Sequence, residues 1–581
     1  MADAAQATKS GTSKPGWRDV IRSLRNRKTG FMALFGFASG LPFALFLGTL
    51  YAWLTEAEVD LETMGVFSLI GLAYAFQFLW SPLIDKVDIA GFRKLGRRKQ
   101  WMVPAQILLG IILVTMSLLE PRTQLGWFSL LAGIGAFASA TQDIAINAWR
   151  IDVADEEATL DILSTVYQMG FRLASLVGGA FGLIIAARIG WPLTYMLMGA
   201  ILLGIGIVGL FAPDSDASVD DGPAAQDEHL LGLRKAGELT PAIRARALGV
   251  VTLLWGAAIG VVLVFMVLSL TNAPEDRPNP TDFTLNWGPW IIVATVVLPA
   301  LIAGWLSKQK QRGTNLLAED APAKGGGGFL LDHLYRALLL PLVEFVGRLG
   351  WSLVLILALV LTYRICDAIW GTFAYPFYLG ELEYTNDEVA FASKFFGVGA
   401  IIAGLAIGGY MLTVLGRMLT LTIGAFLAAA TNLLYADLAI GGANMQAASD
   451  AIGFSALIGF MAPFGSEGLP RLTFTIMFEN LAIGIAGAAY VAWLSSIVSK
   501  QYSAVQYALL SSLTLLVGTL GRGALGEMIE DRGYYDVFIL TTAIGGVAVV
   551  LCIAEWLRQA RAGRRAAGIV TPDTGETVPA E

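Results

Sequence analysis

The sequence predicts an all-α polytopic membrane protein with about 14 spanning helices. Hydrophobic residues make up 56% of its 581 residues and charged residues only 15%, whereas soluble domains carry about 25% charged residues. Apolar stretches long enough to cross the hydrocarbon core of a bilayer as helices recur from Gly30 to Leu557. The length of the chain is therefore assigned to membrane spans and not to about three or four soluble domains.

The candidate spans form two groups of six with a pair between them. The first six are 30–54, 64–84, 101–119, 125–149, 163–187 and 191–212, the pair is 246–271 and 286–306, and the last six are 351–379, 388–411, 417–436, 471–496, 503–525 and 535–557. The segments on either side of the pair, 213–245 and 307–328, are acidic or glycine-rich, as solvated linkers are. Segment 329–349 has apolar residues at helical spacing, which predicts a helix lying in the membrane interface.

The two six-helix groups echo each other, which predicts an internal repeat. The following residues match at one constant spacing in the fifth and sixth spans of the two groups: Gly178, Gly190, Trp191 and Tyr195 in the first, and Gly521, Gly533, Tyr534 and Phe538 in the second. Two six-helix halves with the substrate site between them describe the major facilitator fold. The expected organisation is a tail at 1–29, halves at 30–212 and 351–557, a middle insert at 213–350 that contains an extra hairpin, an insert at 437–469 within the second half, and a tail at 558–581.

Basic residues beside the spans predict that both termini are cytoplasmic. The tail 1–29 holds seven lysines and arginines and the connection 86–99 holds six, whereas the first connection, 55–63, holds four acids and no base. Because basic loops are retained in the cytoplasm, these two basic segments are expected inside the cell and the insert 437–469 outside the membrane.

Five ionisable residues lie well inside the predicted spans, namely Asp143, Arg172, Arg364, Asp367 and Glu479. Each costs about 2.5–3.5 kcal/mol at membrane depth, so we expect them to face a water-filled cavity or one another. Arg172 and Arg364, one in each half, could hold a carboxylate of an anionic substrate between the halves. Arg364 and Asp367 share a helical face and could instead be a structural ion pair. Glu479 is then the preferred proton carrier, with Asp143 and Asp367 as the alternatives.

Aromatic residues near these charges complete the predicted cavity wall. They are Trp370, Tyr375 and Tyr378. Most other tryptophans lie at span edges, where they form the interfacial belt of membrane proteins. Lys394 and Arg150 also lie near span ends, and for both we expect the charged group to reach out to water along the span.

The loop after the second span has a pattern of its own. Asp85-Lys86 is followed by Leu95-Gly96-Arg97-Arg98-Lys99, which resembles the cytoplasmic loop motif of the major facilitator superfamily. We therefore expect Asp85, Arg97 and Arg98 to act in conformational gating.

Several classes of function are excluded by composition. A net charge of −7 gives no basic surface for nucleic acid, and no phosphate-binding P-loop motif is present. The two histidines lie outside the predicted spans and the two cysteines lie in separate spans, which argues against a metal site and a disulfide. A membrane-embedded enzyme would favour clustered histidines or paired acids at one interface, whereas the acids here are dispersed. We expect a secondary transporter that is not an enzyme, needs no cofactor and is monomeric.

Several motifs resemble the AmpG-type muropeptide permeases. They are Gly40–Phe43, Phe78–Asp85, Leu95–Arg98, Ser139–Ile144, Phe478–Leu481 and Ser503–Ser511. The resemblance implies proton-driven import of GlcNAc-anhydro-MurNAc peptides across the bacterial inner membrane, for cell-wall recycling and β-lactamase induction. Gln142 and Asn480, which lie in these motifs, join the expected substrate contacts. Asn147 stands where the family commonly has an acid. The alternative is a related transporter of another anionic solute, such as acetyl-CoA, a peptide or a drug.

Overall fold

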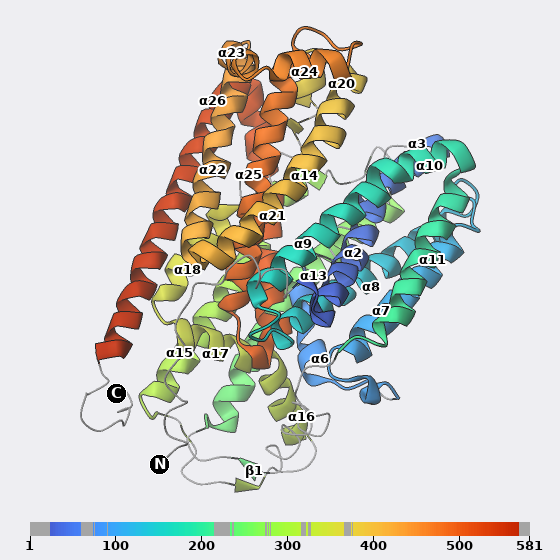
Figure 1. Ribbon diagram of the computed structural model, residues 1–581. Helices are drawn as coiled ribbons and strands as arrows, with labels where there is room; N and C mark the ends of the chain where they lie inside the picture. Colours follow the sequence, from blue (N-terminus) through green and yellow to red (C-terminus); the bar gives the residue numbers. More distant parts are fainter. Residues whose placement is uncertain are drawn as a thin grey trace, which may run out of the picture.

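The computed structural model describes residues 24–59, 74, 76–89, 91–213, 233–234, 238–272, 276, 278, 280–314, 316, 321–322, 327–364, 373–374 and 376–568. Within these ranges its regular structure is helical apart from one short sheet, in which β1 (Leu233–Arg234) pairs antiparallel with β2 (Ala321–Pro322). Most helices belong to two bundles, one coloured blue to teal and the other yellow to red in Figure 1. The predicted all-α fold class is confirmed.

The first bundle brings two of its helices into backbone contact. It comprises α2 (Arg27–Ala44), η1 (Leu45–Thr49), α3 (Leu50–Glu56), η2 (Gln77–Leu79), α6 (Ser81–Lys86), η3 (Arg93–Leu95), α7 (Lys99–Met116), α8 (Leu125–Asp152), α9 (Leu160–Leu176), η4 (Val177–Phe181), α10 (Gly182–Ile189) and α11 (Trp191–Gly209). A Cβ atom at Gly36 of α2 would collide with the Tyr167 carbonyl oxygen of α9, and one at Gly170 of α9 with the Ala33 carbonyl oxygen of α2. Small residues at such crossings let membrane helices approach closely and gain van der Waals contact.

The second bundle also contains a close helix crossing at glycine residues. It comprises α18 (Ser352–Tyr363), η9 (Pro376–Glu381), α20 (Asn386–Ala390), η10 (Phe391–Gly397), α21 (Val398–Leu415), α22 (Arg417–Ala439), α23 (Ala443–Ala451), α24 (Phe454–Met461), α25 (Leu469–Ser496), η11 (Lys500–Tyr502) and α26 (Ser503–Gly568). A Cβ atom at Gly404 of α21 would collide with the Leu481 carbonyl oxygen of α25, and one at Gly484 with the Ile401 carbonyl oxygen. Each half therefore contains at least one close helix crossing built on glycine.

Sharp turns recur at matching places in the two bundles. Gly96 before α7 and Gly416 before α22 have φ values of 94° and 83°. Gly190 before α11 and Gly533 within α26 have φ values of 83° and 81°, and Gly533 interrupts the helical geometry of α26. Glycine adopts such angles readily, whereas other residues are strained there. These matching turns agree with the internal repeat that the sequence predicts.

The middle insert packs against both bundles. It comprises α13 (Pro241–Thr271), α14 (Pro280–Ile292), η7 (Val293–Val297), α15 (Leu298–Gln311), α16 (Gly327–Leu334), η8 (Tyr335–Leu339) and α17 (Leu340–Leu349). One buried cluster joins Phe78 and Ile84 of the first bundle, Ala504 of α26, and Trp255 and Leu342 of the insert. The insert thus packs against both bundles, in addition to joining them covalently along the chain.

Eleven helices within the described ranges are long and apolar enough to cross a membrane. Leu331–Leu349 and Ser352–Tyr363 pass the same test together but are bent by 106°, so they would make a twelfth if they form one span. Of the spans that the sequence predicts, 64–84 and 351–379 lie partly outside the described residues.

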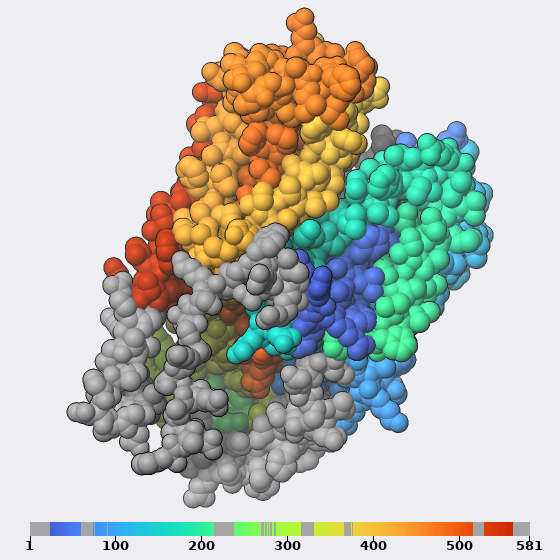
Figure 2. Space-filling view, viewed as in Figure 1, coloured from blue at the N-terminus to red at the C-terminus, as the bar shows by residue number. Residues whose placement is uncertain are grey.

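The bundles meet at one end of the molecule and diverge at the other (Figure 1). We call the region where α6, α17 and the first turn of α26 meet the closed end. The region of α3, α10, α20 and α24 is the open end. Figure 2 shows a notch between the two bundles at the open end. The boundary between the bundles therefore has a cavity mouth at the open end.

Candidate functional site in the central cavity

A cavity lies between the two bundles and extends from the open end toward the closed end. It consists of two adjoining chambers of about 500 and 480 Å³. The outer chamber, nearer the open end, is lined by residues of η1, η4 and α10 among others, and the inner chamber by deeper residues of α2, α8 and α9. Arg172, Ile401, Asn480 and Ile483 line both chambers, so the two are continuous. Side chains from both bundles form its walls.

Arg172 and Arg364 line the same inner chamber from opposite bundles. Arg172 projects from α9 and also lines the outer chamber. Arg364 directly follows the last residue of α18. Two guanidinium groups on opposite walls of one chamber can each bind a carboxylate through paired hydrogen bonds. The geometry therefore permits the substrate clamp, and substrate binding by the two arginines stays a prediction.

Asp143 is a carboxylate of the inner chamber that is held by hydroxyl groups. Its Oδ1 accepts hydrogen bonds from the Ser39 hydroxyl at 2.5 Å and the Tyr167 hydroxyl at 2.7 Å. The Asn147 side chain donates to the Asp143 backbone carbonyl at 2.8 Å, so it lies on the same face of α8. These contacts fix the carboxylate at the chamber wall, where a ligand or a proton can reach it.

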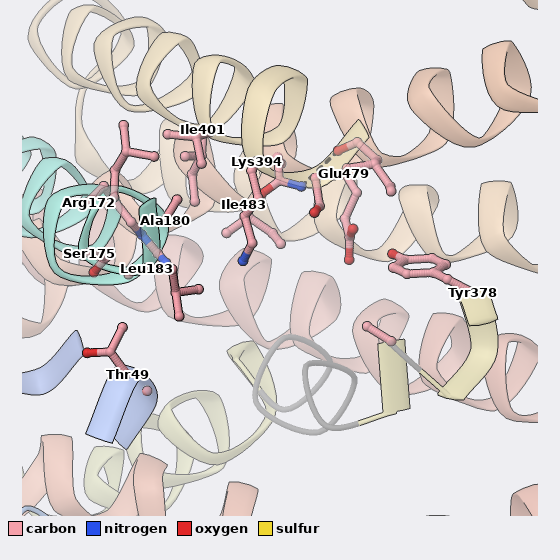
Figure 3. Close-up of a pocket in the computed structure, with 18 of the residues that line it drawn as sticks. Thr49, Arg172, Ser175, Ala180, Leu183, Tyr378, Lys394, Ile401, Glu479 and Ile483 are labelled. Carbon is pink, nitrogen blue, oxygen red and sulfur yellow. Dashed lines mark hydrogen bonds between the residues drawn. The ribbon is translucent and has the colours of Figure 1, made fainter. Parts of the chain in front are cut away.

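Glu479 is the corresponding acid of the outer chamber, and it also contacts a tyrosine. The buried Tyr435 hydroxyl donates a hydrogen bond to the Glu479 carboxylate and lies 2.7 Å from the Tyr378 hydroxyl. Figure 3 shows the Glu479 carboxylate facing Tyr378 across the chamber. Asp143 lies on α8 and Glu479 on α25, the fourth predicted span of each half. Each half thus presents one tyrosine-bonded acid to the cavity.

Lys394 lies on the wall of the outer chamber, together with its neighbour Ser393. Both belong to η10, a π-helical segment, and such segments are frequent at functional sites. Figure 3 shows the Lys394 side chain extending into the space between the bundles. The sequence interpretation, in which the ammonium group reaches water along its span, differs from this position.

Arg150 forms the floor of the cavity, and its predicted exposure to the cytoplasm is wrong. The side chain is 0% exposed. Its guanidinium group lies between the rings of Tyr167 at 4.9 Å and Tyr507 at 5.1 Å, and it donates to the Ser495 hydroxyl at 2.8 Å. Tyr167 belongs to the first bundle, whereas Tyr507 and Ser495 belong to the second. Arg150 therefore closes the bundle interface beneath the inner chamber through cation–π contacts and a hydrogen bond.

Asp85 and Arg98 join the two bundles at the closed end. The Asp85 carboxylate accepts hydrogen bonds from the backbone N–H groups of Val505 at 3.0 Å and Ala504 at 3.4 Å, in the first turn of α26. Arg98 forms ion pairs with Asp85 at 2.8 Å and Asp152 at 2.7 Å and donates to the Ser503 hydroxyl at 2.8 Å. A carboxylate at a helix N-terminus satisfies unpaired N–H groups and interacts favourably with the helix dipole.

Arg97 completes this network from the same loop. It pairs with Asp85 at 3.2 Å and donates to the Gln501 carbonyl oxygen of the second bundle at 2.9 Å. Burial and the adjacent Arg98 lower the pKa of Arg97 to about 10. Burial also acts against the charge of Arg98, but Asp152 and Asp85 outweigh it and raise the pKa of Arg98. Both guanidinium groups therefore stay charged at neutral pH and hold the closed end together.

Further polar contacts cross the closed end. Arg417 at the start of α22 pairs with Asp161 at the start of α9 at 2.9 Å. The insert takes part as well, because Arg348 of α17 donates to the Ile497 carbonyl oxygen at 2.9 Å and Glu344 accepts from the Gln506 amide of α26 at 2.5 Å. Opening of this end would have to break contacts with the insert in addition to those between the bundles.

Comparisons with known proteins agree with this architecture. The family described as acetyl-coenzyme A transporter 1 matches residues 31–125. The anhydromuropeptide permease of Escherichia coli K12 is 28% identical over 93% of this chain and 82% of its own length. A Rickettsia conorii protein named as transporter AmpG 4 is 25% identical over 87% of this chain and 91% of its own. The chain is thus similar to AmpG permeases over most of its length. The resemblance that the sequence motifs indicate is thereby confirmed.

Solved structures show that the chain has the major facilitator fold. The proton:xylose symporter XylE matches with a TM-score of 0.53 at 11% identity, over 92% of this chain and 95% of its own. FucP, solved in the outward conformation, matches with a TM-score of 0.50 at 11% identity, over 90% and 97%. At such identities the likeness concerns the fold alone, and it confirms the predicted fold.

The remaining predicted substrate contacts divide into three groups. Tyr378 lines the outer chamber and Asn480 lines both chambers. Gln142 differs from its prediction: it is fully buried, and its amide donates to the Ala38 carbonyl oxygen of α2 at 2.7 Å, so it joins α8 to α2 away from the chamber walls. The last group, Asp367, Trp370 and Tyr375, lies outside the described residues.

The cavity is also lined by residues that the sequence did not indicate as site residues. They include Ser39, Tyr74, Gln77, Tyr167, Ser393, Lys394, Tyr490 and Tyr507. Most are uncharged, so no cost of burying a charge distinguishes them in the sequence from ordinary packing residues. For Lys394 a signal was present, because Lys394, Val398 and Ile401 follow the i, i+4, i+7 spacing of one helical face.

Proposed function

We propose that this protein imports anhydro-muropeptides, that is, GlcNAc-anhydro-MurNAc peptides, from the periplasm to the cytoplasm and uses the proton gradient to do so. The observation that carries the proposal is the cavity between the halves, with Arg172 and Arg364 on opposite walls and a mouth at the open end. The similarity to the E. coli anhydromuropeptide permease over 93% of the chain supports the choice of substrate.

The chemistry of the cavity walls suits such a substrate. Peptide carboxylates can be held by Arg172 and Arg364, and sugar and peptide amides by Asn480 and other polar side chains. The inner chamber also presents aromatic residues that can contact the faces of sugar rings, namely Phe43, Tyr74, Phe171 and Tyr490. A ligand with sugars at one end and carboxylates at the other therefore finds both kinds of partner in one cavity.

We assign proton coupling to Glu479, with Asp143 and Asp367 as alternative carriers. Glu479 lies in the outer chamber, where protons arriving through the mouth meet it before Asp143. A proton that enters the cell contributes about 2.3 kcal/mol per 100 mV of membrane potential. In a transport cycle of alternating access, protonation of such an acid together with substrate binding would permit the halves to reorient.

We assign the closed end to the cytoplasm and the open end to the periplasm. The basic connection 86–99 lies at the closed end, and basic loops are retained in the cytoplasm. The state described here is then outward-facing, in the inner membrane of a bacterium, with both termini in the cytoplasm. Delivery of anhydro-muropeptides there would serve cell-wall recycling and supply the signal for β-lactamase induction.

Transport of acetyl-CoA or a similar anionic solute is the second candidate function. The match of residues 31–125 to the family described as acetyl-coenzyme A transporter 1 favours it. The same arginines could bind phosphate groups as readily as carboxylates. The two candidates differ in the ligand alone, so a direct comparison of ligands separates them.

Uptake by arginine variants tests the proposed site. We expect Arg172→Gln and Arg364→Gln in proteoliposomes to raise the KM for labelled anhydro-muropeptide about tenfold or more, because each removes a charge-assisted contact. Arg188→Gln, at an exposed position near the end of α10, is the matched control and should behave as wild type. A folded Arg172→Gln protein, verified by its elution as a single species, with unchanged uptake would contradict the proposed binding site.

A further inference from the structure

Lys394 is a cationic side chain of the outer chamber that takes no part in the proposed clamp of Arg172 and Arg364. Lys394 lines that chamber on the same helical face as Val398 and Ile401. Ile401 lines both chambers, and it lies seven residues farther along the helix. At 1.5 Å per residue, the Lys394 backbone is therefore roughly 10 Å nearer the open end than the junction of the chambers. Lys394 is exposed, as expected for a charged group in a water-filled mouth.

The neighbouring hydroxyl group supports a ligand at this position. The Ser393 Oγ atom is buried and has no hydrogen-bond partner among the described residues. A buried polar group without a partner costs about 1–3 kcal/mol, and so such groups normally have a partner in the protein, in water or in a ligand. A ligand that reaches Lys394 would pass directly beside this hydroxyl group.

The charges of the two chambers follow the same pattern at two depths. Among the described residues, the charged groups that line the outer chamber are Arg172, Lys394 and Glu479, whereas those that line the inner chamber are Arg172, Arg364 and Asp143. Arg172 belongs to both sets, so three basic groups follow one another from the mouth toward the floor. Within this part of the chain each chamber has two bases and one acid, and the acid accepts a hydrogen bond from a tyrosine. These described residues give an excess of positive charge at each depth, which favours an acidic ligand group there.

We infer that Lys394 and Ser393, opposite Arg172, form an outer anion subsite that binds a carboxylate of the substrate. Arg364 and Arg172 hold a second acidic group at the inner depth. The ligand class is a molecule with at least two carboxylates, one for each depth of the cavity. The inference rests on the proposed function, and within it the peptide portion of the anhydro-muropeptide supplies the carboxylates. Lys394 is then a specificity-determining residue that selects ligands by peptide charge.

The test compares two ligands on the wild type and three variants. The ligands are a labelled anhydro-muropeptide with free peptide carboxylates and the same compound with the carboxylate at the end of its peptide amidated. Lys394→Met keeps the length of the side chain and removes its charge, Lys394→Arg retains the charge, and Lys308→Met, at an exposed position in α15, is the control. Initial uptake rates in proteoliposomes give kcat and KM for each combination.

We expect Lys394→Met to raise the KM for the free-acid ligand about tenfold, with little change in kcat and no change for the amidated ligand. Wild type should itself show a higher KM for the amidated ligand, and Lys394→Arg should restore most of the preference for the free acid. Equal effects of Lys394→Met on both ligands, or no effect on either, would overturn the outer subsite and leave the proposed function standing. If wild type transports neither ligand, the proposed function fails and the outer subsite fails with it.

Discussion

The Asp85 carboxylate accepts a hydrogen bond from the backbone N–H group of Val505 over 3.0 Å and so joins the first bundle to the N-terminus of α26 in the second. This contact exists only while the closed end is closed, because the two residues belong to different halves. Arg98 forms an ion pair with the same carboxylate at 2.8 Å and a second ion pair with Asp152. One acid thus serves as a helix cap and as the counter-ion of a buried arginine.

Replacement of Asp85 should weaken the closed end. Asp85→Asn removes the charge at the helix N-terminus and one partner of Arg98, so we expect the outward-facing state to lose about 1–3 kcal/mol relative to the inward-facing state. Spin labels at the exposed positions of Lys94 and Lys500 would report a larger fraction of long distances. Asp88→Asn, in the same loop but partly exposed, should leave the distances unchanged. Identical distance distributions for Asp85→Asn and wild type would refute this role.

Arg150 should control access to the cavity from the closed end. Arg150→Gln removes both cation–π contacts and the hydrogen bond to Ser495, so the floor between Tyr167 and Tyr507 should loosen. A cysteine introduced at Asn147 in a cysteine-free protein should then react several times faster with a membrane-impermeant thiol reagent applied at the closed end. Arg246→Gln, an exposed position in α13, is the control variant. Unchanged reactivity in Arg150→Gln would mean that other contacts form the floor.

The glycine crossing of α21 and α25 should be essential for stability. Gly404→Ala would place a methyl group against the Leu481 carbonyl oxygen, and we expect a loss of about 1–3 kcal/mol in the free energy of unfolding. Gly399→Ala lies on the same helix with open space around its added methyl group, and it should be neutral or slightly stabilising. Thermal unfolding of the detergent-solubilised variants measures the difference. Equal melting temperatures for the two variants would show that the crossing can relax.

Glu479 should be required for coupling to the proton gradient but not for substrate binding. Glu479→Gln keeps the shape of the side chain and cannot release a proton, so accumulation driven by a pH gradient should be lost while exchange of labelled for unlabelled ligand persists. Glu467→Gln, an exposed position at the open end, should retain both activities. Full proton-driven accumulation by Glu479→Gln would transfer the role to another acid, with Asp143 as the first alternative.

The sequence predicted how deep in the spans the charged residues lie better than it predicted what their side chains face. Arg172 and Arg364 are expensive to bury in lipid, and that cost predicted that they face a water-filled cavity or another charged residue. Lys394 and Arg150 lie nearer the span ends, where a charged group can reach water, face a cavity or lie between aromatic rings at similar cost. Only the packing of one bundle on the other decides among these outcomes: Lys394 lines the cavity, whereas Arg150 lies between aromatic rings beneath it.

The fold was predictable wherever local sequence determines backbone geometry. Gly190 and Gly533 were recognisable as a repeated pair, and both adopt the left-handed turn that glycine permits. Gln142 was wrongly predicted to contact the substrate, because its motif does not indicate whether the residue binds a ligand or joins two helices. A polar residue that joins two helices and one that binds a ligand look the same in a single sequence. The structure separates them, since the Gln142 amide is bonded to the Ala38 carbonyl oxygen.

The most direct test of the account is uptake of labelled anhydro-muropeptide by proteoliposomes that contain the wild-type protein, under an inward proton gradient. We predict accumulation that a protonophore abolishes, that unlabelled anhydro-muropeptide suppresses and that acetyl-CoA leaves unchanged. Absence of uptake, or suppression by acetyl-CoA and not by unlabelled anhydro-muropeptide, would contradict the proposed substrate.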